Sequence, residues 1–305
     1  MSSELAAADG LDRESLQRLS RRSNARGLAQ LAAHGAILGA TACLVWVSRG
    51  PWSVLALVAY GVVLNFLFCA LHESVHRTAF DSRRLNDSVA WIAGAVLLLP
   101  PEFFRAFHFA HHRFTQDPER DPELAQPPPA TPTQYLWRVS GIPNWSRRLS
   151  TTLRHALTGR VREPFVAPAK HPTIVREARW LWLTYAAVLA LSIAFRSTAA
   201  LTYWVVPVLF GQPFLRAYLL SEHLGCPMVP DMYANTRTTY TNAAVRLITW
   251  QMPFHAEHHV FPAVPFHRLG QLNALLRQRL RVTAPGYIAL HVALLRQLRS
   301  RSRRP

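Results

Sequence analysis

The stretch Pro253-Phe254-His255-Ala256-Glu257-His258-His259-Val260-Phe261-Pro262 is the most informative part of this 305-residue chain, because it places three histidines between two prolines. The prolines restrict a helix to the segment between them. Histidines at positions i, i+3 and i+4 project from one face of a helix with 3.6 residues per turn. The stretch therefore predicts a short helix that presents three imidazole rings in one direction.

Two further histidine clusters occur in the chain. The same spacing recurs at His108, His111 and His112, and a looser pair, His72 and His76, lies one helical turn apart. Imidazole nitrogen is a ligand for zinc, copper, iron and nickel. Eight histidines exceed the three or four ligands that one zinc ion takes, and they suffice for two ions. We interpret the three clusters as parts of one polynuclear metal site.

Half of the residues are apolar and lie in long runs, which favours an all-α integral membrane protein. We predict four transmembrane helices in two hairpins, at 31–47 and 52–71 and at 180–195 and 199–220. Residues 89–99 are too short to cross, so we expect a re-entrant or interfacial segment there. A cytoplasmic helical cap would then carry the histidines. The expected divisions are an N-terminal segment 1–30, a first hairpin 31–71, a cytoplasmic region 72–179, a second hairpin 180–220 and a cytoplasmic region with a basic tail 221–305.

The formal net charge of +17 does not indicate a nucleic-acid-binding protein, because the arginines flank apolar spans. Only Arg49 and Arg196 lie in the two turns that would face the far side. The other basic residues share the side of both termini, which the positive-inside rule assigns to the cytoplasm. We therefore expect a multi-pass protein of a bacterial inner membrane with its termini and its histidine clusters in the cytoplasm. Three scattered cysteines indicate neither a disulfide framework nor a cysteine-type zinc site.

Residues near the clusters complete the predicted site. His223 directly follows the second hairpin, as His72 follows the first, and is a ninth candidate ligand; the alternative is a buried, hydrogen-bonded histidine. The pair His72 and His76, taken alone, is also compatible with ordinary helix surface. Acidic side chains are placed to orient ring N–H groups, namely Glu73, Asp117, Asp121, Glu257 and, beside His223, Glu222. For Glu73 and Glu257 a plain helix-surface role is the alternative.

The clusters resemble the three-box signature of membrane fatty-acid desaturases, with box one His72-Glu73-Ser74-Val75-His76, box two His108-Phe109-Ala110-His111-His112 and box three His255-Ala256-Glu257-His258-His259. The resemblance covers about residues 50–275 and includes the runs His112–Glu119 and Pro262–Leu269. It implies four spans, a cytoplasmic non-haem di-iron centre and O2-dependent insertion of a double bond into an acyl chain or other lipid. The implied iron ligands are the eight box histidines and His223.

Two departures from the family pattern affect the expected chemistry. Some members have a water-mediated asparagine ligand one turn before the equivalent of His223; here Leu219 stands there, so Glu222 substitutes or a tenth ligand is absent. The chain has no His-Pro-Gly-Gly haem-binding stretch, so we expect electrons from a separate ferredoxin or small haem protein.

Other functions remain alternatives. A hydroxylase or ketolase acting on a carotenoid, alkane or sphingolipid would carry the same boxes, because its reaction also begins with hydrogen abstraction. A metal transporter or haem carrier fits less well, since transport needs polar residues deep in the spans, and Asn65 is the clearest one here.

Overall fold

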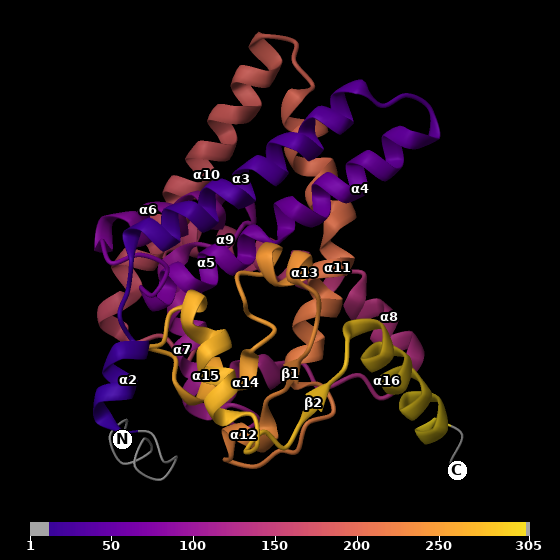
Figure 1. The fold of residues 1–305 in the computed structure, drawn as a ribbon. Coiled ribbons are helices and arrows are strands. Elements are labelled where there is room, and N and C mark those ends of the chain that lie inside the picture. The colour runs from indigo at the N-terminus through magenta and orange to yellow at the C-terminus, as the bar shows by residue number, and fades with distance from the viewer. Residues whose placement is uncertain (1–11, 303–305) are drawn as a thin grey trace.

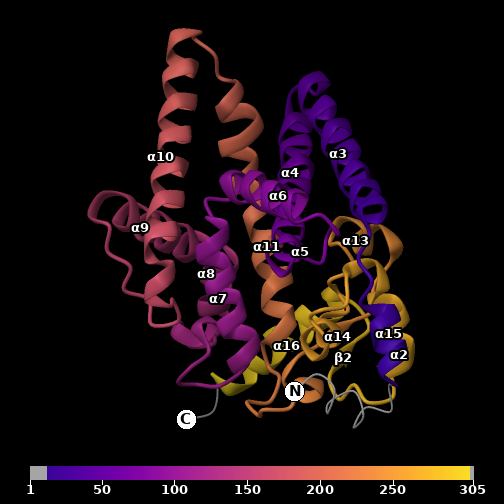
Figure 2. The same ribbon diagram turned by 90° about the vertical axis from the view of Figure 1, so that its left-hand side faces the viewer.

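The structure is a computed structural model that describes residues 12–302. Residues 1–11 of the predicted N-terminal segment and residues 303–305 of the basic tail lie outside the described residues. The described part is mostly helical, with one pair of two-residue strands. Two helical hairpins project from one end, and the elements that carry the histidine boxes gather at the other (Figures 1 and 2).

The first hairpin follows a short helix, α2 (Arg13–Leu19), and consists of α3 (Asn24–Val47), α4 (Pro51–Asn65) and α5 (Leu67–His76). The helix α3 begins before the predicted residue 31 because the Ser23 side chain accepts the backbone N–H of Arg26 and caps the helix. Between α3 and α4 the chain turns at Gly50, whose φ of 58° favours glycine. Asn24–Val47 and Pro51–His76 are long and apolar enough to cross a membrane.

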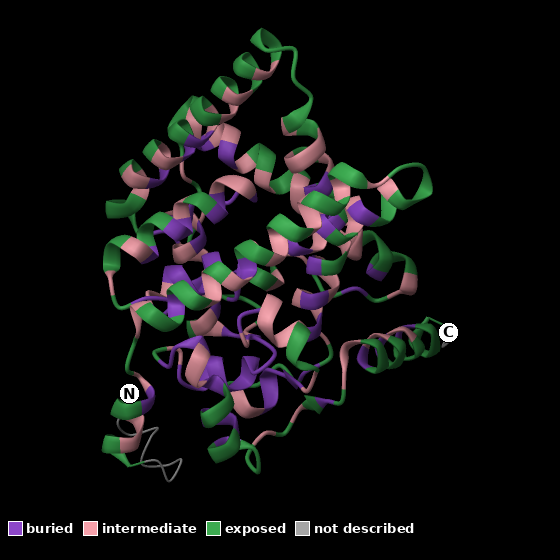
Figure 3. Cartoon of the chain, turned by 45° about the horizontal axis from the view of Figure 1, so that its top comes forward, coloured by how far each residue is buried: buried purple, intermediate pink, exposed green. Residues whose placement is uncertain are grey.

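The second predicted hairpin corresponds to α10 (His171–Ala194), the π-helix η3 (Leu201–Val205) and α11 (Val206–His223). Within residues 12–302, only the two stretches of the first hairpin are long and apolar enough to qualify as membrane spans. A third qualifies if α6 and α7 together form one bent span. Four spans therefore remain a prediction. Large apolar side chains on the outer faces of α3 and α10 are exposed, as a lipid-facing surface requires (Figure 3).

The two hairpins meet where α4 and α11 approach at backbone distance. A Cβ atom at Gly61 would lie 2.1 Å from the Pro207 carbonyl oxygen, and one at Gly211 would lie 1.9 Å from the Gly61 carbonyl oxygen. Small residues permit this contact between membrane helices. Asn65 Nδ2 donates to the Val208 carbonyl oxygen over 2.9 Å, so this polar side chain joins the two helices.

The predicted interfacial segment forms a sharp bend. The helix α6 (Arg83–Val96) meets α7 (Pro101–Phe114) at 98°, a geometry compatible with a broken span or a re-entrant loop. As expected, α7 begins at Pro101, a favoured first-turn residue, and ends before Asp117. The segments that follow, with exposed apolar side chains on α8 and α9, are η1 (Pro122–Ala125), α8 (Pro132–Val139), α9 (Ile142–Thr158) and η2 (Pro168–Lys170).

The C-terminal part covers the inner ends of the hairpins. The helix of box three, α14 (His255–Val260), has six residues between Pro253 and Pro262, and all six are buried. The strands β1 (Thr238–Thr239) and β2 (Thr283–Ala284) pair in parallel, with Thr238 opposite Thr283. The remaining helices are α12 (Met232–Asn235), α13 (Ala243–Ile248), η4 (Phe266–Arg268), α15 (Leu269–Leu276) and α16 (Tyr287–Arg301). The prediction of a short helix between the prolines is confirmed.

Candidate metal centre

The structure brings the nine predicted histidines together from four helices. Box one lies at the end of α5, box two on α7, box three on α14, and His223 is the last residue of α11. The rings form two sets, and within each set one nitrogen per residue lies within 4.8 Å of the others. Set one is His72, His76, His108, His112 and His258, and set two is His111, His223, His255 and His259. The expected convergence of the three boxes and His223 is therefore found.

The ring nitrogens are spaced like ligands of a common ion. The Nε2 atoms of four histidine pairs lie 3.0–3.2 Å apart, in the pairs His108–His112, His112–His258, His111–His223 and His255–His259. Two nitrogens bound at right angles, each at about 2.1 Å from a metal, are about 3.0 Å apart. All four pairs lie within a set, two in each, and His112–His258 joins boxes two and three in set one. The spacing fits metal binding.

Burial gives the box-three rings the protonation state that metal binding needs, whereas the carboxylates of Glu123 and Asp121 raise the pKa of His111 despite its burial. Desolvation, followed by repulsion from neighbouring rings, lowers the pKa of His255, His258 and His259, so these rings are neutral near pH 7. Neutral imidazole is the form that binds a metal. Neither ring nitrogen of buried His72 has a hydrogen-bond partner among the described residues, which is rare for buried polar atoms. A metal ion would satisfy such a nitrogen.

Three of the rings are held through Nδ1. His111 Nδ1 donates to Asp121 Oδ1 over 3.0 Å, and His223 Nδ1 donates to the Asn235 carbonyl oxygen over 3.1 Å. His259 Nδ1 lies 3.2 Å from the Thr115 hydroxyl. A hydrogen bond at Nδ1 fixes the ring orientation and leaves Nε2 as the ligand atom. For His111 and His223 the carboxylate and the carbonyl also define which nitrogen carries the proton.

Three of the five acids predicted to orient rings lie beside one. Besides Asp121, Glu222 Oε1 lies 3.5 Å from His255 Nδ1, and Glu73 Oε1 lies 3.9 Å from His72 Nδ1. Burial alone would raise the pKa of Asp121, but its hydrogen bond to His111 and backbone N–H donors lower it overall. Asp121 is therefore an ionised acceptor.

The structure corrects the expectation for the other two acids. Asp117 follows the end of α7, and its carboxylate pairs with Arg120 and caps the next turn instead of contacting a ring. Glu257 points away from the rings of its own helix and accepts hydrogen bonds from Thr238 Oγ1 over 2.5 Å and from Asn273 Nδ2. It therefore anchors α14 to β1 and α15, a role that is neither ring orientation nor helix surface.

Sequence reasoning missed three other neighbours of the rings. Thr115 follows His111 by four residues and caps the end of α7, so its position one turn after His111 could have indicated it. Glu123 lies 3.9 Å from His111 Nδ1 but belongs to η1, after a turn. The Asn235 carbonyl acts through the backbone, and no sequence pattern marks it.

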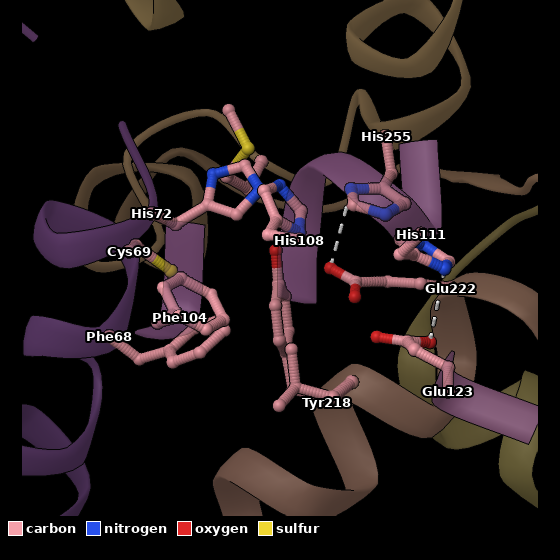
Figure 4. Close-up of a pocket in the computed structure, with 12 residues that line it drawn as sticks. Phe68, Cys69, His72, Phe104, His108, His111, Glu123, Tyr218, Glu222 and His255 are labelled. Atoms are coloured by element: carbon pink, nitrogen blue, oxygen red, sulfur yellow. Dashed lines mark ion pairs between the residues drawn. The ribbon is translucent and has the colours of Figure 1, made fainter. Parts of the chain in front are cut away.

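A small cavity reaches both histidine sets. Its volume is about 20 Å³, which is room for one water-sized molecule. It is lined by His72 and His108 of set one, by His111 and His255 of set two, and by Leu219 and Glu222 of α11. Figure 4 shows Phe68 and Phe104 beside His72 and His108, and Glu222 beside His255. The site therefore has an apolar side and an acidic side.

Comparison with known proteins agrees with this geometry. The chain is 26% identical over 291 residues to the dihydrorhizobitoxine desaturase of Bradyrhizobium elkanii, covering 88% of this chain and 78% of that protein. It is 26% identical to the sphingolipid delta(4)-desaturase DES1 of Drosophila melanogaster, covering 74% of this chain and 68% of the relative. It is 21% identical to the sn-1 oleoyl-lipid 12-desaturase of a Picosynechococcus strain, with 77% and 73% covered. The family model described as fatty acid desaturase matches residues 46–291, and this chain belongs to that family.

Proposed function

We propose that this membrane protein is an O2-dependent, non-haem di-iron desaturase that introduces a double bond into a fatty acyl chain or another lipid. The observation that carries the proposal is the pair of histidine sets that share one small cavity. Nine imidazoles are too many for one ion, and nitrogen ligands are compatible with iron. The family membership supports a desaturase or a related activity on lipid.

In this proposal set one and set two each hold one iron. The iron pair would supply the oxidising chemistry that removes hydrogen from unactivated C–H bonds. For each double bond formed, the reaction consumes one O2, two electrons and two protons, and with the two substrate hydrogens it yields two waters. The electrons would come from a separate ferredoxin or small haem protein. Leu219 offers no ligand atom beside the four histidines of set two, and the Glu222 carboxylate lies 3.5 Å from His255 Nδ1.

The residues around the sets have separate roles. Asp121 and the Asn235 carbonyl keep the protons of His111 and His223 on Nδ1, so that Nε2 of each ring faces its set. Phe68 and Phe104 line the small cavity beside His72 and His108 and exclude water from that side. An apolar chain against these two rings would present C–H bonds to the histidine sets.

We further propose the four-span topology with the metal centre on the cytoplasmic side. The two predicted hairpins lie side by side, and the helices that carry the histidine boxes, α5, α7 and α14, lie toward their common inner end (Figure 2). Basic residues are concentrated at that end, and only Arg49 and Arg196 lie at the outer turns. This distribution follows the positive-inside rule.

The proposal is tested by expressing the chain in a host with a simple lipid profile and analysing the lipids by mass spectrometry. Loss of two hydrogens from one lipid species is expected, whereas a gain of one oxygen would indicate the hydroxylase or ketolase alternative. The His258→Ala variant should remain in the membrane and form no product. His171→Ala, at the start of α10 and away from both sets, is the matched control and should retain activity. Product formation by His258→Ala would refute the assignment.

A further inference from the structure

A large cavity of about 1660 Å³ continues from the small cavity at the histidines. The two cavities share Phe68, Phe104, Leu219 and Glu123 in their linings, so they are adjacent. The large cavity is bordered by residues of α7, α8, α9, α11 and α16. Its lining contains apolar side chains, among them Phe104 and Leu219, and nine basic side chains against five acidic ones. This combination of apolar and basic side chains is suited to a ligand with an apolar part and an anionic part.

The basic part contains four arginines from three helices, which we call the arginine cluster. Its members are Arg138 of α8, Arg147 and Arg148 of α9, and Arg216 of α11. Arg138, Arg148 and Arg216 are partly buried, and Arg147 is exposed. Arg148 and Arg216 repel each other, and so do Arg138 and Arg147. Burial, together with the charge of Arg216, lowers the pKa of Arg148 to about 9.

No acid among the described residues forms an ion pair with the cluster. Among residues 12–302, no carboxylate oxygen lies within 4.0 Å of any of the four guanidinium groups. Arg148 donates one bond to the Leu97 carbonyl oxygen, and Arg216 donates one to Asn144 Oδ1. A guanidinium group has five N–H donors, so most of them are not used. Glu123 attracts Arg216 and Arg138, and Glu222 attracts Arg216. Their carboxylates lie 3.9 Å from His111 Nδ1 and 3.5 Å from His255 Nδ1, respectively.

Arginines that repel one another and retain free donors are suited to an anion, because carboxylate and phosphate accept two parallel N–H bonds from a guanidinium. We propose that the arginine cluster binds the anionic end group, a carboxylate or a phosphate, of the substrate. The apolar chain then runs along Phe104 and Leu219 to the histidine sets. This inference rests on the proposed function, since it assigns the substrate of that centre.

The spacing along α11 supports this path. Arg216, Leu219, Leu220 and His223 are at positions i, i+3, i+4 and i+7, so they share one face of the helix. Two turns separate Arg216 from His223, which is about 10 Å along the axis at 1.5 Å per residue. The end group and the metal centre would therefore occupy the same side of α11, with leucines between them.

The experiment measures binding without turnover. The full chain is placed in phosphatidylcholine nanodiscs and irradiated with a 12-carbon fatty acid that carries a diazirine near its carboxylate, and labelled peptides are mapped by mass spectrometry. Labels are expected on α9 and α11. In the Arg148→Gln/Arg216→Gln variant labelling should fall about tenfold, because charge-assisted hydrogen bonds are lost. Arg299→Gln, which changes an exposed arginine outside the cavity lining, is the matched control.

Three further labelling experiments identify the chemical group that the cluster binds. The methyl ester of the same probe lacks the charge and should label at least tenfold less; equal labelling would overturn the proposal. Competition by dodecyl phosphate but not by dodecanoate would identify a phosphate end group, and the reverse a carboxylate. If phosphatidylglycerol in the nanodisc abolishes labelling as well as either single-chain amphiphile does, the cluster binds bilayer headgroups and the substrate assignment is wrong.

Two further measurements separate a loss of anion binding from misfolding and from a failure of the proposed function. Arg148→Lys/Arg216→Lys retains both charges and should recover part of the labelling, which a misfolded variant would not do. Lipid analysis of the same preparations separates this inference from the proposed function. Double-bond formation with labelling that does not depend on the arginines would refute the cluster and leave the desaturase assignment intact. Arginine-dependent labelling without any double-bond formation would support anion binding by the cluster and refute the desaturase assignment.

Discussion

The replacement Asp121→Asn tests whether the carboxylate beside His111 controls metal binding. Asp121 accepts from His111 Nδ1 over 3.0 Å and from the backbone N–H groups of Gln116 and Glu123 over 2.8 and 2.9 Å. The asparagine side chain has the same shape but only one acceptor oxygen. At least one of the three N–H donors would therefore face its NH2 group. The negative charge that fixes the proton on Nδ1 is also lost. Mutation of a residue that hydrogen-bonds to a metal ligand typically weakens metal affinity about 10–100-fold.

We therefore expect Asp121→Asn to bind iron about 10–100-fold more weakly and to lose about 1–3 kcal/mol of folding stability. The assay is iron content per chain during titration with a chelator, measured by mass spectrometry of the metal, with thermal unfolding in the same detergent. Asp117→Asn is the matched control, because Asp117 pairs with Arg120 and contacts no ring. The reasoning would be refuted by Asp121→Asn retaining wild-type affinity, or by both variants losing iron equally.

Three further substitutions test a helix contact, a candidate metal ligand and a buried hydrogen bond. Gly211→Ala places a Cβ 1.9 Å from a carbonyl oxygen of α4, so it should lower the thermal midpoint in detergent, while Gly39→Ala, with open space around its Cβ, should not. His223→Ala removes one of four rings in set two and should reduce iron content from two per chain towards one; unchanged content would exclude His223 as a ligand. Thr238→Val removes the hydroxyl that donates to Glu257 and should destabilise the protein by about 1–3 kcal/mol, which denaturant unfolding in detergent can check.

The convergence of the histidines could be predicted from sequence because they lie on helices with clear boundaries. Pro253 and Pro262 restrict α14 to six residues, and Pro101 fixes the start of α7, so the faces of boxes two and three were defined. His223 was identifiable because it directly follows an apolar run of the sequence, and it is the last residue of α11. In each case local chain geometry determines where the ring points.

The surroundings of the rings depend on contacts between distant segments, and there sequence reasoning failed in part. Asp117 and Asp121 both follow box two, but the turn after α7 directs Asp121 to His111 and Asp117 to Arg120. Glu257 lies within box three, yet helix periodicity gives no sign that Thr238 and Asn273 would bind it. The arginine cluster joins residues up to 78 positions apart, from Arg138 to Arg216, and only the packing of α8, α9 and α11 brings them to one cavity.

The most direct test of the account is the metal content of the purified wild-type chain, measured together with its absorption spectrum. The two histidine sets predict two iron atoms per chain and no haem absorption. A single zinc ion per chain, or a haem spectrum, would contradict the assignment of a di-iron centre.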